Sequence, residues 1–249
     1  MLTRQLTRFA PVLFNGGSSL TAQVQALFAG GRVGGMWDKG DLSTLFQDTA
    51  GATPVTAVTQ PIARVNDKSG LGNHATQPTA GSRSLYQVVS GYGCAQFDAT
   101  DDALLFPAIT FGGAFNTFVA GKVTGGTSGI HLWRTADSGG GYWGVYQSGS
   151  ALSATAAAVG SPSYFKDGAP ISPETREQIY TLINGVDSVL ESIGVALSAE
   201  TALQFSGYGA GFNFQGNAHR VLMISGTLTA AEKLLCRRWA AEGNGATVV

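Results

Sequence analysis

The chain has 249 residues, a formal net charge of −1 and only 12% charged residues, but 35 glycines. A β-sandwich of this size can fold as one domain and bury about 70–75% of its unfolded surface, so it needs no disulfide or metal. Frequent glycine favours short strands and tight turns, because glycine costs about 1 kcal/mol inside a helix. The sequence has no stripe of lysine and arginine, which excludes nucleic acid as a partner.

The start of the chain carries neither an export signal nor a membrane span. Arg4 and Arg8 precede an apolar patch at residues 9–14, which Pro11 interrupts and which is too short for a signal peptide. No apolar run in the sequence approaches the roughly 18 residues that a membrane helix needs. We therefore expect a protein that is made in the cytoplasm, without an export signal and without membrane insertion.

A short helix is predicted near the N-terminus. Ser18 and Ser19 can cap a helix that begins at Leu20, and Gly30 ends it. One face of this helix is apolar and consists of Leu20, Val24, Leu27 and Phe28. A helix this short is not stable alone, so it either packs on its own domain or docks onto a neighbouring subunit.

The composition changes at Gly34, and we therefore assign residues 1–33 as an N-terminal attachment arm and residues 34–249 as one domain. Residues 47–84 are rich in Thr, Ala, Gly, Pro and Asn, which predicts ordered loop with short extended pieces. The cluster Asn66–Asn73 in this segment has the composition of a turn.

Strand patterns fill the rest of the domain. Apolar, β-branched or alternating segments predict strands at Thr117–Val123, Ile130–Arg134, Tyr142–Tyr146, Ala202–Phe205, Gly211–Phe214 and Arg220–Ile224. Asp-Gly and Asn-Gly are the residue pairs that type I′ turns prefer. They predict two hairpins, one over Tyr164–Ala169 and one over Gln178–Leu190 with Asn184-Gly185 as its turn.

A second helix is predicted near the C-terminus. Thr229 and Glu232 have the spacing of a capping box, in which each side chain accepts a hydrogen bond from the other residue's backbone N–H. Gly243 ends this helix near Glu242. Together the elements predict an all-β fold, a two-sheet antiparallel β-sandwich with a short N-terminal helix and a C-terminal helix.

The two cysteines, Cys94 and Cys236, stand at no motif spacing. Their number excludes a disulfide scaffold and a cysteine zinc site. They could pair with each other, but we expect two buried thiols.

Four segments occur in a characteristic order, namely Trp37-Asp38, Asp41–Asp48, Asn66–Ala75 and Phe97–Leu104. In this order they resemble the concanavalin A-like/laminin-G-like jelly-roll domains of tail, fibre and other virion proteins of tailed bacteriophages. The C-terminal strand followed by a capped helix is similar too, so the resemblance spans residues 34–243. Ala99 stands where the family has a glycine after its Phe-Asp pair, so the tight turn there is expected to differ.

The resemblance implies a jelly roll in a non-catalytic virion structural protein, an adhesin-like or decoration subunit of the tail or capsid. Its partners would be other virion proteins, contacted through residues 1–33, and further copies of itself in a homo-oligomer. The alternative is a carbohydrate-binding module that recognises a host surface glycan. A polysaccharide-degrading enzyme is a weaker third hypothesis.

Catalytic patterns are missing from the sequence. Glucanases that resemble this fold place their carboxylates as Glu-x-Asp-x-Glu along one strand, where the side chains share a face. This sequence has neither that motif nor a Gly-x-Ser-x-Gly turn. Its three histidines carry no triad signal, and His74 is expected to cap a turn rather than to catalyse; the other two are His131 and His219. We therefore expect no enzyme.

Asp98, Asp101 and Asp102 form the most acidic cluster. Laminin-G-like domains often hold a calcium ion near a sheet rim, so the resemblance allows calcium here. The spacing is not that of an EF-hand, and we favour a role in which these carboxylates hold a turn by accepting backbone N–H bonds. We expect no other cofactor.

Four aromatic residues are the candidate carbohydrate-binding site, because sugar rings stack on rigid aromatic faces. They lie on two adjacent predicted strands and are Trp133, Tyr142, Trp143 and Tyr146. The competing interpretation places half of them in the core. Phe212 and Phe214, two residues apart, are expected to form one buried strand face.

Overall fold

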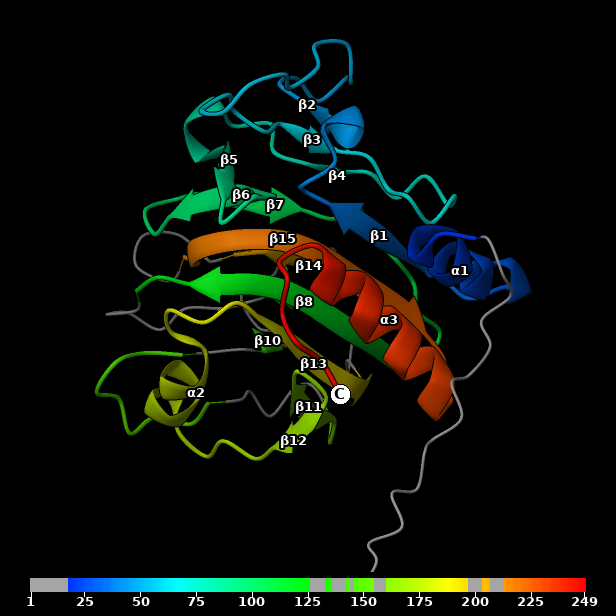
Figure 1. Cartoon of the computed structure of the whole chain (residues 1–249), viewed down its shortest axis with the longest axis vertical. Coiled ribbons are helices and arrows are strands. Elements are labelled where there is room, and N and C mark those ends of the chain that lie inside the picture. Colours follow the sequence, from blue (N-terminus) through cyan, green and yellow to red (C-terminus); the bar gives the residue numbers. More distant parts are fainter. Residues whose placement is uncertain are drawn as a thin grey trace, which may run out of the picture.

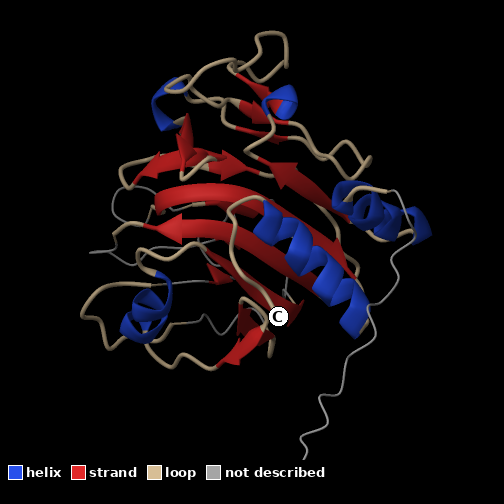
Figure 2. Ribbon diagram, in the orientation of Figure 1, coloured by secondary structure: helices blue, strands red, loops and turns tan. Residues whose placement is uncertain are grey.

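The computed structural model describes residues 18–125, 133–135, 142–143, 146–154, 160–196, 203–206 and 213–249. Residues 133–135 and 142–143 are described by their backbone alone. Strands make up most of the regular structure, with helices at the surface (Figure 2). None of the helices in the described ranges has the length and apolarity to cross a membrane.

Two antiparallel sheets form a sandwich, as predicted. The larger sheet contains β1 (Gly34–Asp38), β5 (Leu85–Val89), β6 (Tyr92–Asp98), β8 (Phe115–Val123), β11 (Ser163–Lys166), β12 (Ala169–Ile171), β13 (Ser188–Val195) and β15 (Gln215–Ser225). The smaller sheet contains β2 (Leu45–Phe46), β3 (Arg64–Val65), β4 (Ala75–Thr76), β7 (Leu104–Leu105), β9 (Trp133–Thr135), β10 (Tyr142–Trp143) and β14 (Leu203–Phe205). Within the described ranges the orders are β12-β11-β13-β8-β15-β6-β5, with β1 also on β15, and β10-β9-β14-β7-β4-β3-β2 (Figure 1).

The helices are α1 (Leu20–Ala26), α2 (Arg176–Ile183) and α3 (Ala230–Glu242), with 3-10 turns η1 (Leu27–Gly30), η2 (Leu42–Thr44) and η3 (Ala80–Ser82). The predicted helix starts are confirmed. Ser19 caps α1 by accepting a hydrogen bond from the Ala22 N–H. Thr229 and Glu232 cap α3 reciprocally, and α3 ends at Glu242.

The main core lies between the two sheets. Along β6, Ala95 and Phe97 point inward and are buried, whereas Gln96 and Asp98 are exposed on the other face. The Phe97 ring packs against Phe205 of the smaller sheet, with 5.1 Å between the ring centroids. Each such buried side chain stabilises the fold by about 1.5–3 kcal/mol.

A second core lies on the outer face of the larger sheet, where α3 crosses β8, β13 and β15 (Figure 1). Trp239 of α3 is fully buried there, and its indole N–H donates to Thr21 of α1 at 3.1 Å. Val24 and Phe28 are buried in the same cluster. Of the two alternatives for the N-terminal helix, the structure therefore shows packing on its own domain.

Both cysteines are free and buried, as predicted. Burial raises the pKa of the Cys94 thiol to about 12 and also raises the pKa of the Cys236 thiol. Both sulfurs therefore stay protonated at neutral pH, and a protonated, buried thiol is a poor nucleophile and metal ligand.

The first predicted hairpin is confirmed. Strands β11 and β12 pair on either side of Asp167 and Gly168, which have φ angles of 54° and 91°. Two successive residues with positive φ are the signature of a type I′ turn.

The second predicted hairpin is wrong in its first half, where residues 176–183 form the helix α2. Thr175 and Gln178 make a capping box that starts this helix. Ile179 and Ile183, four residues apart, then bury their side chains against the sandwich core. The helical spacing of these two isoleucines and the cap outweigh the β-propensity of the segment. The second half of the predicted hairpin does form a strand, β13, which begins at Ser188.

The carboxylate of Asp67 ties the long 47–84 segment to the first strand of the larger sheet. Its Oδ1 accepts hydrogen bonds from the Met36 and Ser69 N–H groups, both at 2.8 Å. Its Oδ2 accepts from the Asn73 N–H at 3.0 Å and the Ser69 hydroxyl at 2.6 Å. In return, the Trp37 indole donates to the Asn73 carbonyl at 2.8 Å. Two oxygens thus satisfy four donors.

We expect Asp67→Asn to destabilise the fold by about 2 kcal/mol or more, because the amide nitrogen would face donors that now bond an oxygen. Urea unfolding followed by tryptophan fluorescence measures the change. Glu174→Gln, an exposed carboxylate whose removal changes the net charge equally, is the control and should stay within about 0.5 kcal/mol. A loss for Asp67→Asn no larger than that of the control would contradict the role assigned to Asp67.

Candidate functional site

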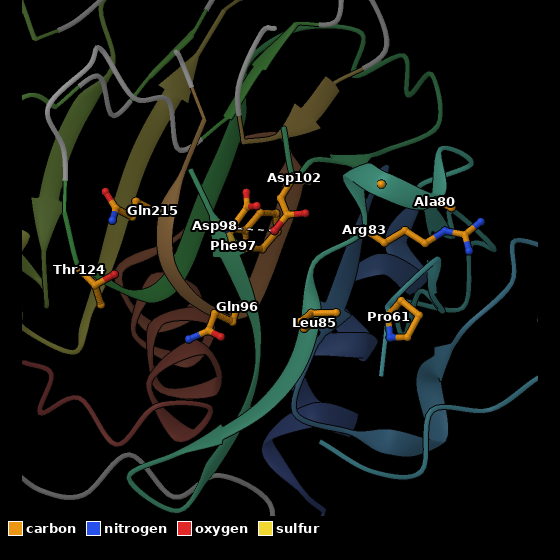
Figure 3. A pocket seen from close by; sticks show the side chains of 11 residues that line it. Pro61, Ala80, Arg83, Leu85, Gln96, Phe97, Asp98, Asp102, Thr124 and Gln215 are labelled. Carbon is orange, nitrogen blue, oxygen red and sulfur yellow. Dashed lines mark hydrogen bonds between the residues drawn. The ribbon is translucent and has the colours of Figure 1, made fainter. Parts of the chain in front are cut away.

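An open pocket of about 480 Å³ lies at the β5–β6 edge of the larger sheet (Figure 3). Segments far apart in the sequence form its walls. They contribute Pro61, Ala80, Gly81, Arg83, Leu85, Gln96, Phe97, Asp98, Asp102, Thr124 and Gln215. A concave site with a few convergent polar groups is the usual form of a small-molecule site.

Strand register brings the polar groups of the pocket together. Gln96 and Asp98 are two residues apart on β6 and therefore share a face. Gln215 begins β15 and lies directly opposite Asp98 in the pairing of the two strands. Thr124 follows the end of β8 and adds a hydroxyl. Two amides, a hydroxyl and a carboxylate thus offer both donors and acceptors to a ligand.

Leu85 and Pro61 form an apolar wall beside these polar groups (Figure 3). The two residues are held together by a bridge between the 59–62 segment and β5, and Leu85 is 38% exposed. The pocket therefore combines a small apolar surface with hydrogen-bonding groups, as suits a ligand with one apolar and one polar face.

The acidic cluster forms a closed turn at the rim of the pocket. Asp102 Oδ2 accepts a hydrogen bond from the Asp98 N–H at 3.0 Å, and Asp98 Oδ1 accepts from the Thr100 N–H at 2.7 Å. Asp101 accepts from the Ser82 hydroxyl at 2.9 Å. The predicted role as acceptors of backbone N–H bonds is confirmed for Asp98 and Asp102, whereas Asp101 accepts from a side-chain hydroxyl.

Ala99 in this turn has a φ of 71°, the left-handed conformation that glycine adopts most readily. The turn therefore keeps the backbone shape that a glycine would give, although the side chain is alanine. A left-handed alanine costs about 1 kcal/mol, which the surrounding hydrogen bonds offset.

Burial raises the pKa of the Asp102 carboxyl to about 6, and the nearby carboxylates of Asp98 and Asp101 add to the rise. Asp102 is only 5% exposed and still lines the pocket. Asp102 therefore loses its charge at around pH 6 and stays mostly ionised at pH 7, whereas an ordinary aspartate loses its charge near pH 4.

The cluster fits calcium poorly. The carboxylate oxygens of Asp98, Asp101 and Asp102 lie within 4.8 Å of one another. Bound through one oxygen each, these three residues would supply three of the six to eight oxygens that calcium takes. Moreover, each carboxylate already accepts a hydrogen bond from its own turn or from Ser82.

Arg83 lines the pocket but is engaged elsewhere. Its guanidinium donates to the carbonyl oxygens of Gln77, Gln47 and Pro78 at 3.1, 3.2 and 3.1 Å. In Figure 3 the guanidinium points away from Asp98 and Asp102. Arg83 thus holds three loops together at the pocket wall.

The predicted aromatic site is only partly within the described structure. Strands β9 and β10 are adjacent, as expected, and Trp133 lies opposite Trp143 in their register. The side chains of Trp133, Tyr142 and Trp143 lie outside the described part of the chain. Tyr146 does not belong to a binding surface, because it is fully buried and packs edge-on against Phe214.

The histidines have structural roles where the structure describes them. His74 accepts the Asp67 N–H at 3.1 Å, which confirms the expected turn cap. His219 lies within β15 rather than before a strand, and its Nδ1 bonds the Gly93 carbonyl at 2.9 Å. Phe214 is buried as expected, whereas His131 and Phe212 lie outside the described residues.

Sequence reasoning missed Gln96, Gln215, Thr124 and Arg83 as site residues. Glutamine and threonine on a strand carry no motif, and only the pairing of β6 with β15 brings Gln215 beside Asp98. The one usable signal was the acidic cluster, which marks the rim of the pocket.

No protein-family model matches the chain, and no curated protein matches it in sequence. Among solved structures, it is similar to a Trypanosoma rangeli sialidase in complex with the inhibitor DANA, at 11% identity and a TM-score of 0.42. The match covers 90% of this chain and 38% of the sialidase, so the chain spans well under half of that protein. A similarity at this level carries no information on function.

We expect Asp102→Asn to stabilise the fold by about 2 kcal/mol at pH 7.5 and to change little at pH 4. With a pKa of about 6 in the folded chain against 3.8 as the ordinary value, native Asp102 binds more protons than unfolded Asp102 between these values. Its contribution to stability therefore falls as pH rises through this window. Urea unfolding at both pH values tests this, and an equal effect of the variant at both would refute the shifted titration.

Proposed function

We propose that the chain is a non-catalytic binding protein, an adhesin-like or decoration subunit of a tailed-bacteriophage particle, that recognises a host surface glycan in the β5–β6 pocket. Its sandwich would belong to the concanavalin A-like/laminin-G-like jelly rolls. The observation that carries the glycan part is the pocket itself, where Gln96, Gln215 and Thr124 surround an open hollow with an apolar wall. Sugars present hydroxyl groups and an apolar ring face, which such a pocket matches.

The arrangement of carboxylates supports binding without hydrolysis. Glycoside hydrolysis needs two carboxyl groups on either side of the scissile bond. Asp98 and Asp102 belong to one turn, and Asp102 accepts the backbone N–H of Asp98. Both carboxylates come from this one turn and lie next to each other in Figure 3, instead of on opposite walls of the pocket as the two acids of a glycosidase do.

The virion setting rests on the resemblance of the segments around Trp37, Asp67 and Phe97 to phage structural proteins. The contacts of Asp67 give part of this motif a role in the fold. Residues 1–33 remain the proposed attachment arm to other virion proteins, although α1 itself packs on α3. A decoration subunit without glycan binding is the second candidate, and the particle would then contain the chain without any sugar ligand.

A glycan array with purified protein, followed by titration calorimetry of each hit, tests the pocket. We expect the double variant Gln96→Ala/Gln215→Ala to lose about tenfold in affinity, since it removes two amides worth about 0.5–1.5 kcal/mol each. Gln25→Ala, an exposed glutamine on α1, is the matched control and should bind like the unaltered protein. Binding that survives the double variant but disappears in Trp143→Ala would move the site to the β9–β10 strands.

Mass spectrometry of purified phage particles tests the virion setting. We expect the chain in particles. We also expect removal of residues 1–17, which spares α1 and its buried contacts with α3, to prevent incorporation. Particles that lack the chain would refute the virion assignment and leave the glycan pocket to be judged by the array alone.

A further inference from the structure

From the charges around the pocket we infer that its ligand is an uncharged saccharide, and that glycans carrying a carboxylate or sulfate are rejected. This inference rests on the proposed glycan binding and names the chemical class that the pocket accepts. It follows from three features of the lining: the pocket's own negative charge, the fixed guanidinium beside it and the neutral amides that remain available.

The negative charge in the pocket has no counterion among the described residues. Asp98 and Asp102 both line the hollow, and Asp101 is close behind them. In the described part of the chain, none of the three forms a salt bridge with a lysine, arginine or histidine. An anionic group placed in the pocket would therefore meet unneutralised carboxylates a few ångströms away.

Among the described residues that line the pocket, the one cation is Arg83, and it is directed elsewhere. Its guanidinium donates three of its five N–H groups to the carbonyl oxygens of Gln77, Gln47 and Pro78. Turning it toward an acidic sugar would leave these three acceptors without their donor and would release the loops that form the wall. A built anion site normally presents a free, bidentate guanidinium, which this wall does not.

The groups that remain available suit hydroxyl groups. The amides of Gln96 and Gln215 both donate and accept, and Asp98 can accept from a sugar hydroxyl. The turn that carries Asp98 is held rigidly, since the Asn213 side chain donates to the Thr100 carbonyl and Asn213 is 2% exposed. Acceptors fixed in this way lose little freedom when a neutral ligand binds.

The test uses matched glycan pairs on an array and in calorimetry, such as lactose-terminated glycans with and without a sialic acid or a sulfate. We expect the neutral member of a bound pair to bind at least about tenfold more tightly at 50 mM salt, with a smaller ratio at 500 mM. Asp98→Asn/Asp102→Asn should shrink the ratio, because an amide oxygen still accepts the turn hydrogen bonds while the charge is gone. Glu174→Gln, which removes a charge away from the pocket, should leave the ratio unchanged.

The outcomes distinguish a failure of this inference from a failure of the proposed glycan binding. Acidic members that bind as tightly as their neutral partners, through a pocket that Gln96→Ala/Gln215→Ala still disrupts, overturn the charge selection and keep the glycan site. A ratio that the aspartate variants leave unchanged also overturns it. Binding by no member of any pair overturns the proposed glycan binding and this inference with it.

Discussion

The hydrogen bonds of Asp67 hold the first strand of the larger sheet in place, and much of the architecture depends on that strand. The bond from Met36 fixes β1 to a loop 31 residues further along the chain. β1 then pairs with the second half of β15, while β6 pairs with its first half. Without the Asp67 contacts, β1 would keep its pairing with β15 on one side only, and the loop that accepts the Trp37 indole N–H would lose its attachment to β1.

Because β1 and β6 both pair with the long strand β15, the backbone must fit closely where the two strands meet. The register of β15 shifts between Ala218 and Arg220, so His219 bulges and bonds the Gly93 carbonyl. Gly40 and Gly93 approach so closely that a Cβ on Gly93 would lie 2.8 Å from the Gly40 Cα. Because β6 is aligned in this way, Gln96 and Asp98 reach the edge where the pocket forms.

Much of the fold could be predicted because it follows from local rules. The side chains of Ser19 and Thr229 cap the helices that follow them, so their position predicts where each helix begins. The pair Asp167-Gly168 is enough to predict a turn. Residues 176–183 were misassigned because the Asn184-Gly185 pair was given more weight than the capping box of Thr175 and Gln178, which is also a local signal. The burial of Ile179 and Ile183 in the core decides between these conflicting signals. Tertiary packing overrides propensity in such short segments.

Two parts of the molecule lie beyond sequence reasoning for a related reason. Lys39 is fully buried with its Nζ 4.9 Å from the Phe205 ring centroid, and burial lowers its pKa to about 7. A lysine is expected at the surface unless its neighbours are known. The pocket is likewise assembled from five separate stretches of chain, and only its acidic turn was recognisable in the sequence, as a cluster of aspartates.

The edges of the larger sheet favour recognition through side chains over recognition through the backbone. At one edge, the 59–62 segment covers the start of β5, with bonds from the Thr59 N–H to the Tyr86 carbonyl and from the Tyr86 N–H to the Gln60 carbonyl. At the other edge, β12 carries Pro170, which has no N–H to offer. The covering segment and the proline both make it unfavourable for a strand of another protein to pair with these edges. The binding that we propose therefore relies on side-chain surfaces such as the β5–β6 pocket, whose lining combines amides, carboxylates and an apolar wall.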